Sequence, residues 1–174
     1  MIGFQWMVLG RSKGFKFVGK SQTNPMRTID RLLEEYGESH QNATNKLIHW
    51  VCVPAIMFSL MGLLWTVRVY GSVTLGMLFL CFASLYYVRL SLSLFVGMVL
   101  ISLAMAWGIM ALEAVAGSLA WQVHLGLFAA AWVGQFIGHQ IEGKKPSFLK
   151  DLQFLLVGPA WLLHFVYRKA GLPI

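Results

Sequence analysis

Charged side chains are almost absent from the middle of this 174-residue chain. Charged residues make up 12% of the sequence and hydrophobic residues 57%, whereas ordinary globular chains are roughly a quarter charged. Between Lys46 and Glu142 the formal charges are those of Arg68, Arg89 and Glu113. A soluble domain of this length cannot bury so much apolar surface, which excludes an ordinary soluble fold. The sequence therefore predicts an all-α, polytopic membrane protein.

Several site types are missing as well. Cysteine occurs only at Cys52 and Cys81, both inside apolar runs, so we expect buried free thiols and neither a disulfide nor a CxxC metal site. The sequence also has no HExxH motif of the zinc metalloprotease kind. The net charge is +7, but basic and aromatic residues are not interleaved, so no nucleic-acid partner is expected. The basic residues instead suit the cytoplasmic loops of a membrane protein.

The first 25 residues differ from the rest of the chain. Their basic residues follow a short apolar start, the reverse of a secretory signal, and no small-residue cleavage site comes after them. We expect residues 1–25 to form a flexible N-terminal tail, with Met26 as an alternative start of the native product. Residues 26–174 are then expected to form a single helical membrane domain.

A short amphipathic helix is predicted at the start of that domain, over residues 26–38. Apolar side chains recur there at helical spacing, and charged residues fill the opposite side. Such a helix commonly lies at the membrane surface, with its apolar face toward lipid. The apolar positions are Ile29, Leu32, Leu33 and Tyr36.

Five apolar segments follow. A transmembrane helix needs ~20 residues, within a range of about 17–25. The first, third and fourth segments meet that length, while the second and fifth are short and either span with snorkelling flanks or dip into the membrane and return. We therefore expect four to five transmembrane helices joined as antiparallel hairpins, with a kink at Gly158–Pro159 in the fifth. The segments cover residues 47–67, 73–88, 90–112, 120–141 and 152–167.

Two polar inserts are expected on one membrane face. The first, residues 40–49, precedes the first segment, and the second, residues 135–142, ends the fourth. Four crossings lie between them, so the chain returns to its original side. That side carries most of the Lys and Arg, which makes it cytoplasmic by the positive-inside rule. We expect an integral membrane protein, of the inner membrane if bacterial and of the endoplasmic reticulum if eukaryotic.

The first insert offers two imidazoles with amides beside them. On one continuous helix His40 and His49 would point to nearly opposite sides, because nine steps of about 100° separate them. An N-cap at Asn42 or Thr44 instead leaves His40 in the loop, where it folds back over the start of the helix. Asn45 lies one turn before His49 and, with Asn42, is expected to orient the imidazoles.

The second insert lies on one helical face. Gln135 and His139 are four residues apart, and His139 and Glu142 are three apart, so an amide, an imidazole and a carboxylate are neighbours. Gly134 and Gly138, also four apart, allow a neighbouring helix to approach closely. Convergence with the first insert would bring three histidines and one carboxylate together.

The positions of the two remaining histidines indicate whether each can join the other three. His124 lies 15 residues before His139, which is ~22 Å along a straight helix, so we assign it a structural or interfacial role near Glu113 on the opposite face. His164 lies beyond Pro159 and is a candidate only if the fifth segment re-enters the membrane.

Such a convergence indicates a metal or proton-transfer site, because polar residues at membrane depth are costly to bury. Hydrogen bonds to helix ends remain the alternative for any single residue of the set. Spacing alone names no metal, since imidazole with carboxylate suits iron, zinc or manganese. Two other functions stay open: a zinc-dependent lipid hydrolase or amidase, and a non-catalytic lipid-binding protein whose polar face holds helices together.

Two stretches resemble a known family of small membrane proteins. They are residues 36–54, YGESHQNATNKLIHWVCVP, and residues 132–146, WVGQFIGHQIEGKKP. The first carries H-x-N-x2-N-x3-H with a proline five residues on, and the second carries QF-x-GH followed by an acidic residue and a basic-proline turn. They resemble the family that contains the fungal 2-hydroxy fatty acid dioxygenase of phytosphingosine breakdown and its bacterial relatives. The number and order of segments over residues 26–171 agree with that family.

The resemblance implies an Fe(II)-dependent oxygenase with His40, His49 and His139 as ligands, and with Glu142 or a water completing the shell. It implies α-oxidation, in which O2 cleaves the C1–C2 bond of a 2-hydroxy fatty acid to give CO2 and an acid one carbon shorter. The acyl chain would lie among the apolar segments, while its carboxylate and 2-hydroxyl group reach the polar face. Membrane lipids are expected as further partners. Three imidazoles would leave open positions on the iron for the 2-hydroxy acid and O2. The oligomeric state stays open.

Overall fold

The computed structural model describes residues 26–143 and 154–173, and our expectation for residues 1–25 lies outside them. The described chain is helical apart from one small hairpin, which confirms the all-α class. The helices are α1 (Thr28–Glu38), α2 (Ala43–Thr66), α3 (Leu75–Leu90), α4 (Leu92–Ala116), α5 (Ala120–Glu142) and α7 (Val157–Ala170). Strands β1 (Arg68–Tyr70) and β2 (Val73–Thr74) pair antiparallel between α2 and α3, and a 3-10 turn, η1 (Gly117–Leu119), joins α4 to α5.

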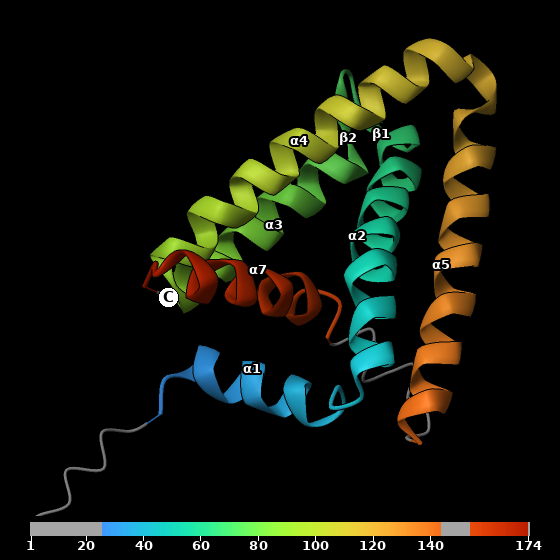
Figure 1. Cartoon of the computed structure of the whole chain (residues 1–174). Helices are drawn as coiled ribbons and strands as arrows, with labels where there is room; N and C mark the ends of the chain where they lie inside the picture. Colours follow the sequence, from blue (N-terminus) through green and yellow to red (C-terminus); the bar gives the residue numbers. More distant parts are fainter. Residues whose placement is uncertain (1–25, 144–153, 174) are drawn as a thin grey trace, which may run out of the picture.

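The helices pack as three pairs (Figure 1). Helices α2 and α5 run side by side in opposite directions, α3 pairs with α4, and α1 pairs with α7. Helices α4 and α5 diverge from the turn at η1, so α5 packs mainly against α2 and hardly against α4. The beginning of α2 and the end of α5 therefore lie at the same end of the molecule, as the count of crossings predicted.

Two helical stretches have the length and apolar composition of a membrane span: α2, and residues 92–142, which comprise α4, η1 and α5. Helix α3 is apolar but has 16 residues, and α7 has 14, so both are short against the ~20 residues that a span needs. The expected number of four to five transmembrane helices is not confirmed and stays a prediction.

Helix α1 is amphipathic as predicted, but its apolar face is not turned to lipid. Ile29, Leu33 and Tyr36 are buried, and they share a hydrophobic cluster with Trp161 and Leu163 of α7. A helix from the far end of the chain therefore covers the face that was expected to meet lipid, and the position of α1 at the membrane surface stays a prediction.

The expected kink at Gly158–Pro159 is also absent. Helix α7 begins at Val157, so Pro159 stands in the first turn, where a missing backbone N–H costs no hydrogen bond within the helix. The proline therefore begins a short helix and does not interrupt a long one. The expected free thiols are found, with Cys52 partly buried, but Cys81 is exposed and not buried as expected.

The contact between α2 and α5 depends on glycines, as the Gly134–Gly138 spacing predicted. A Cβ at Gly134 would overlap Cys52 Sγ, and one at Gly138 would overlap Asn45 Oδ1. At the other end of the pair, Gly62 makes room for the imidazole of His124, which is fully buried. His124 thus has a packing position between the two helices, in line with its predicted structural role.

We expect Gly134→Ala to destabilise the protein by about 1–3 kcal/mol, because the added methyl group meets the Cys52 sulfur in a packed interface. Adding Cys52→Ala should recover most of that loss. Gly126→Ala on the same helix has open space around it and should be neutral or stabilising. Chemical unfolding in detergent, followed by circular dichroism, measures all four proteins. Equal destabilisation at both glycines would contradict the packing assigned to Gly134.

Candidate metal centre

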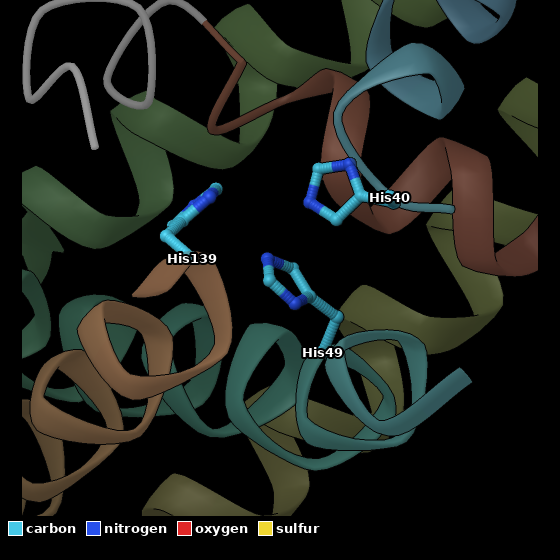
Figure 2. Close-up of side chains that lie close together, drawn as sticks. All are labelled: His40, His49 and His139. Atoms are coloured by element: carbon cyan, nitrogen blue, oxygen red, sulfur yellow. The ribbon is translucent and has the colours of Figure 1, made fainter. Parts of the chain in front are cut away.

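Three histidines from separate parts of the chain meet at one end of the α2–α5 pair (Figure 2). His40 comes from the loop between α1 and α2, His49 from the second turn of α2, and His139 from the last turn of α5. One ring nitrogen from each lies within 4.8 Å of the others. All three side chains are buried, at 3%, 1% and 7% exposure. The structure thus brings together the three histidines that were expected to converge.

His40 reaches the cluster because α2 is capped two residues later. Asn42 is the N-cap, as predicted, and its side chain accepts hydrogen bonds from the backbone N–H groups of Thr44 at 2.9 Å and Asn45 at 3.3 Å. The cap starts the helix after His40 and leaves that residue in the loop. The His40 ring then folds over the helix, with its centroid 4.1 Å from that of His49.

Aromatic side chains from α1 and α7 hold the His40 ring. The Tyr36 ring stacks on it, with centroids 4.2 Å apart and planes at 12°, and Trp161 lies at 5.3 Å. His40 Nδ1 lies 2.6 Å from the Tyr36 backbone oxygen. A carbonyl oxygen only accepts, so Nδ1 carries the proton and the neutral ring presents the lone pair of Nε2.

His49 is oriented in the same way from its own helix. Its Nδ1 donates to the backbone oxygen of Asn45 at 2.9 Å, which again leaves Nε2 as the lone-pair nitrogen. Asn45 was expected to orient this ring, and it contacts the ring through its backbone oxygen. The Asn45 side chain is engaged elsewhere, as a donor to Glu142 at 2.9 Å.

Glu142 joins the end of α5 to the start of α2. Its Oε1 accepts from the backbone N–H of Gln41 at 2.7 Å, and its Oε2 accepts from that of Asn42 at 2.9 Å and from the Asn45 amide. N–H groups at the start of a helix attract an anion, so this carboxylate suits its position. Both oxygens are thereby used to hold the His40 loop, which argues against the expected role of Glu142 as a ligand.

A cavity opens directly beside the cluster. His49 and His139 line it together with Gln135, Trp132, Tyr36 and residues of α7. The Gln135 side chain is buried and lines this cavity together with His49 and His139, in agreement with its predicted place beside the histidines. The remaining wall is largely apolar, from Val53, Ile56, Met57, Phe154, Leu155, Gly158 and Pro159.

The other candidates lie apart from the cluster. His124 is buried between α2 and α5, beside Gly62 and Phe58. His164 lines a different groove, between α1 and α7, and the described part of the chain does not bring it to the other three. Sequence reasoning missed the aromatic support from Tyr36 and Trp161. The one available signal was that Tyr36 stands four residues before His40.

We expect Glu142→Gln to loosen the His40 loop, because the amide group offers one acceptor oxygen where the carboxylate offers two. Hydrogen bonds to a charged group contribute about 1.5–3 kcal/mol, and solvent access here puts the loss nearer 1 kcal/mol. Hydrogen exchange read by mass spectrometry should show faster exchange of the Gln41 and Asn42 amides. Glu35→Gln, which removes an exposed carboxylate on α1, serves as the control and should leave both amides protected. Unchanged exchange in Glu142→Gln would contradict the assigned role.

Comparison with known proteins supports the resemblance seen in the motifs. No solved structure matches the chain. The chain is 32% identical over 139 residues to the 2-hydroxy-palmitic acid dioxygenase MPO1 of Saccharomyces cerevisiae, an alignment that covers 77% of each protein. The family profile described as 2-hydroxy-palmitic acid dioxygenase Mpo1-like matches residues 26–170, which include both polar inserts and the three clustered histidines. The chain therefore belongs to the Mpo1-like family.

Proposed function

We propose that this protein is an iron-dependent membrane dioxygenase that performs α-oxidation of 2-hydroxy fatty acids. The observation that carries the proposal is the meeting of His40, His49 and His139 beside a mostly apolar cavity. Family membership is the second support, because the yeast member of the family is named as a 2-hydroxy-palmitic acid dioxygenase. The site and the family name thus point to the same chemistry.

The cluster suits a metal ion in its donors and in how they are held. Imidazole nitrogen is a good donor for iron, zinc and manganese. Metal-binding histidines usually donate the second ring N–H to a carbonyl or carboxylate, and His40 and His49 each do so to a backbone oxygen four residues earlier. His40, His49 and His139 are the residues that would hold the ion.

The cavity beside the cluster suits the polar end of a 2-hydroxy acid. The Gln135 amide and the Trp132 indole N–H, both in its wall, are donors for a carboxylate or hydroxyl oxygen. No lysine or arginine of the described chain lines this cavity, and Lys144 and Lys145 lie outside the described residues. Neutral donors would therefore orient the head group, and the apolar wall would take the acyl chain.

The proposed reaction consumes one O2 for each substrate molecule. The C1–C2 bond breaks, C1 leaves as CO2, C2 becomes the carboxyl carbon of an acid one carbon shorter, and the remaining oxygen and hydrogens leave as water. Ferrous iron would activate O2 for reaction with the substrate, and the 2-hydroxy acid itself provides the four electrons that reduce O2. The protein's part is to orient the acid with Gln135 and Trp132 and to exclude water through the apolar walls.

A membrane location is part of the proposal. The two apolar stretches are mostly exposed, with 39% and 22% of their most apolar windows buried, whereas the core helix of a soluble protein is mostly buried. A bilayer would cover that surface. Lys46 lies in the first turn of α2, and Arg27 and Arg31 belong to the start of α1, the helix that leads into the His40 loop. By the positive-inside rule these basic residues favour a cytoplasmic cluster.

We expect wild-type protein purified without oxygen to contain stoichiometric iron. His49→Ala and His139→Ala should each lose the iron and reduce activity by more than ~100-fold, because each change removes a ligand. His164→Ala should keep both, because that ring lies in another groove. Elemental analysis and thermal unfolding are measured on all four proteins. Zinc in place of iron, with turnover under nitrogen, would support the lipid amidase. A loss of stability with no turnover in any of the four proteins would support a lipid-binding protein.

We expect iron-loaded protein to convert 2-hydroxypalmitate into pentadecanoic acid and CO2 only when O2 is present. Under labelled O2, mass spectrometry should find label in the carboxyl group of the shorter acid, because that carbon gains oxygen in the reaction. Palmitate, which lacks the 2-hydroxyl group, is the matched control and should be recovered unchanged. Intact 2-hydroxypalmitate after incubation with iron-loaded protein would contradict the proposal.

A further inference from the structure

A second cavity lies behind the first and shares two of its walls. Met57 of α2 and Pro159 of α7 line both spaces. The first cavity touches the histidines, and the second lies between α2, α3 and α4, on the far side of these two residues. The two cavities are therefore adjacent, and Met57 and Pro159 stand between the histidine cluster and the apolar interior.

The wall of the second cavity is hydrocarbon and thioether. Tyr87 and Ser102 are its polar side chains, and the Tyr87 hydroxyl donates to the Leu156 carbonyl at 2.5 Å. Such a wall has little to offer a polar ligand, since buried polar groups need hydrogen-bond partners. It suits the methyl end of an alkyl chain.

Four of the nine methionines of the chain line this second cavity. The two spaces are small as they stand, about 40 Å³ and about 20 Å³, so an acyl chain enters only if side chains turn aside. Methionine is unbranched and has three rotatable bonds, so it rearranges more readily than a branched side chain. The four are Met57, Met61, Met98 and Met105.

The distance from the cluster to the second cavity matches the length of a long acyl chain. His49 and Met61 lie twelve residues apart on α2, which is ~18 Å at 1.5 Å per residue. A zigzag of ~1.5 Å carbon–carbon bonds covers that length in about 14 bonds. A much shorter acyl chain would end before the second cavity and would leave it empty.

We propose that the acyl chain of the substrate passes between Met57 and Pro159 into the second cavity, and that Ala83 on its wall sets the accepted chain length. The inference rests on the proposed function, because it takes the acid's head group to bind at the histidines. Ala83 is buried and is the smallest side chain of that wall, so a larger residue there fills the space that the methyl end would take.

Photolabelling of the wild-type protein tests the path without any turnover. The probe is 2-hydroxypalmitate carrying a diazirine beside its methyl end, irradiated without oxygen in nanodiscs. Fragment-ion mass spectrometry should locate the label on cavity-wall residues such as Ala83 and Met98, and an excess of 2-hydroxypalmitate should remove it. Label confined to outward-facing residues such as Leu85 and Val96, or label that the excess does not remove, would overturn the proposal.

Ala83→Leu tests chain-length selection. The variant should lose turnover of 2-hydroxypalmitate by about tenfold or more relative to 2-hydroxydecanoate, because one methylene in an apolar pocket is worth about 10–200-fold. Ala104→Leu makes the same change at an exposed position of α4 and should leave that ratio unchanged. An unchanged ratio in Ala83→Leu would overturn the proposal, and the photolabelling decides it if this variant does not fold.

The experiments distinguish a failure of the proposed dioxygenase function from a failure of the proposed acyl-chain path. Competed labelling of the second cavity in a protein that oxidises nothing would support the acyl path and overturn the dioxygenase. Oxidation of 2-hydroxypalmitate with label absent from the second cavity would support the dioxygenase and overturn the acyl path.

Discussion

The close contact between the start of α2 and the end of α5 is the constraint on which the candidate site depends. Gly134 and Gly138 bring the two backbones together, and Glu142 then reaches across to the N–H groups at the start of α2. Two of the three histidines, His49 and His139, belong to these two helix ends. The third is held by the loop that Glu142 fastens. The close contact of the two backbones and the hydrogen bonds of Glu142 thus hold the three imidazoles near one another without help from an ion.

The other helices complete the site from its sides. Helix α1 supplies Tyr36, whose ring stacks on His40 and whose carbonyl fixes the tautomer of that ring. Helix α7 covers the apolar face of α1 and places Trp161 against both rings. Pro159, in the first turn of the same helix, closes one side of the cavity. One short helix therefore supports the ligand loop and shapes the space where a substrate would lie.

The features that could be predicted from the sequence depend on spacing along one helix or on the number of apolar segments. The N-cap at Asn42 and the small residues at Gly134 and Gly138 follow from spacing along one helix, and the meeting of the histidines followed from counting apolar segments. Reasoning failed where a distant segment decided the outcome. The apolar face of α1 reads as a membrane-facing surface until α7 is known to cover it. Glu142 reads as a ligand because it stands beside His139, and only the structure shows the backbone N–H groups of Gln41 and Asn42 that occupy it. The number of transmembrane helices and the identity of the ion stay predictions.

The order of the three clustered histidines along the chain has a consequence for biosynthesis. His40 is made before the first apolar segment, and His139 follows 99 residues later, at the end of α5. Contacts between residues so distant form late, because the intervening chain must be brought together first. A ribosome-bound chain that has released α2 but not α5 holds two imidazoles and no third. The three histidines therefore come together only when the fourth apolar segment is in position, and an ion held by all three could bind no earlier.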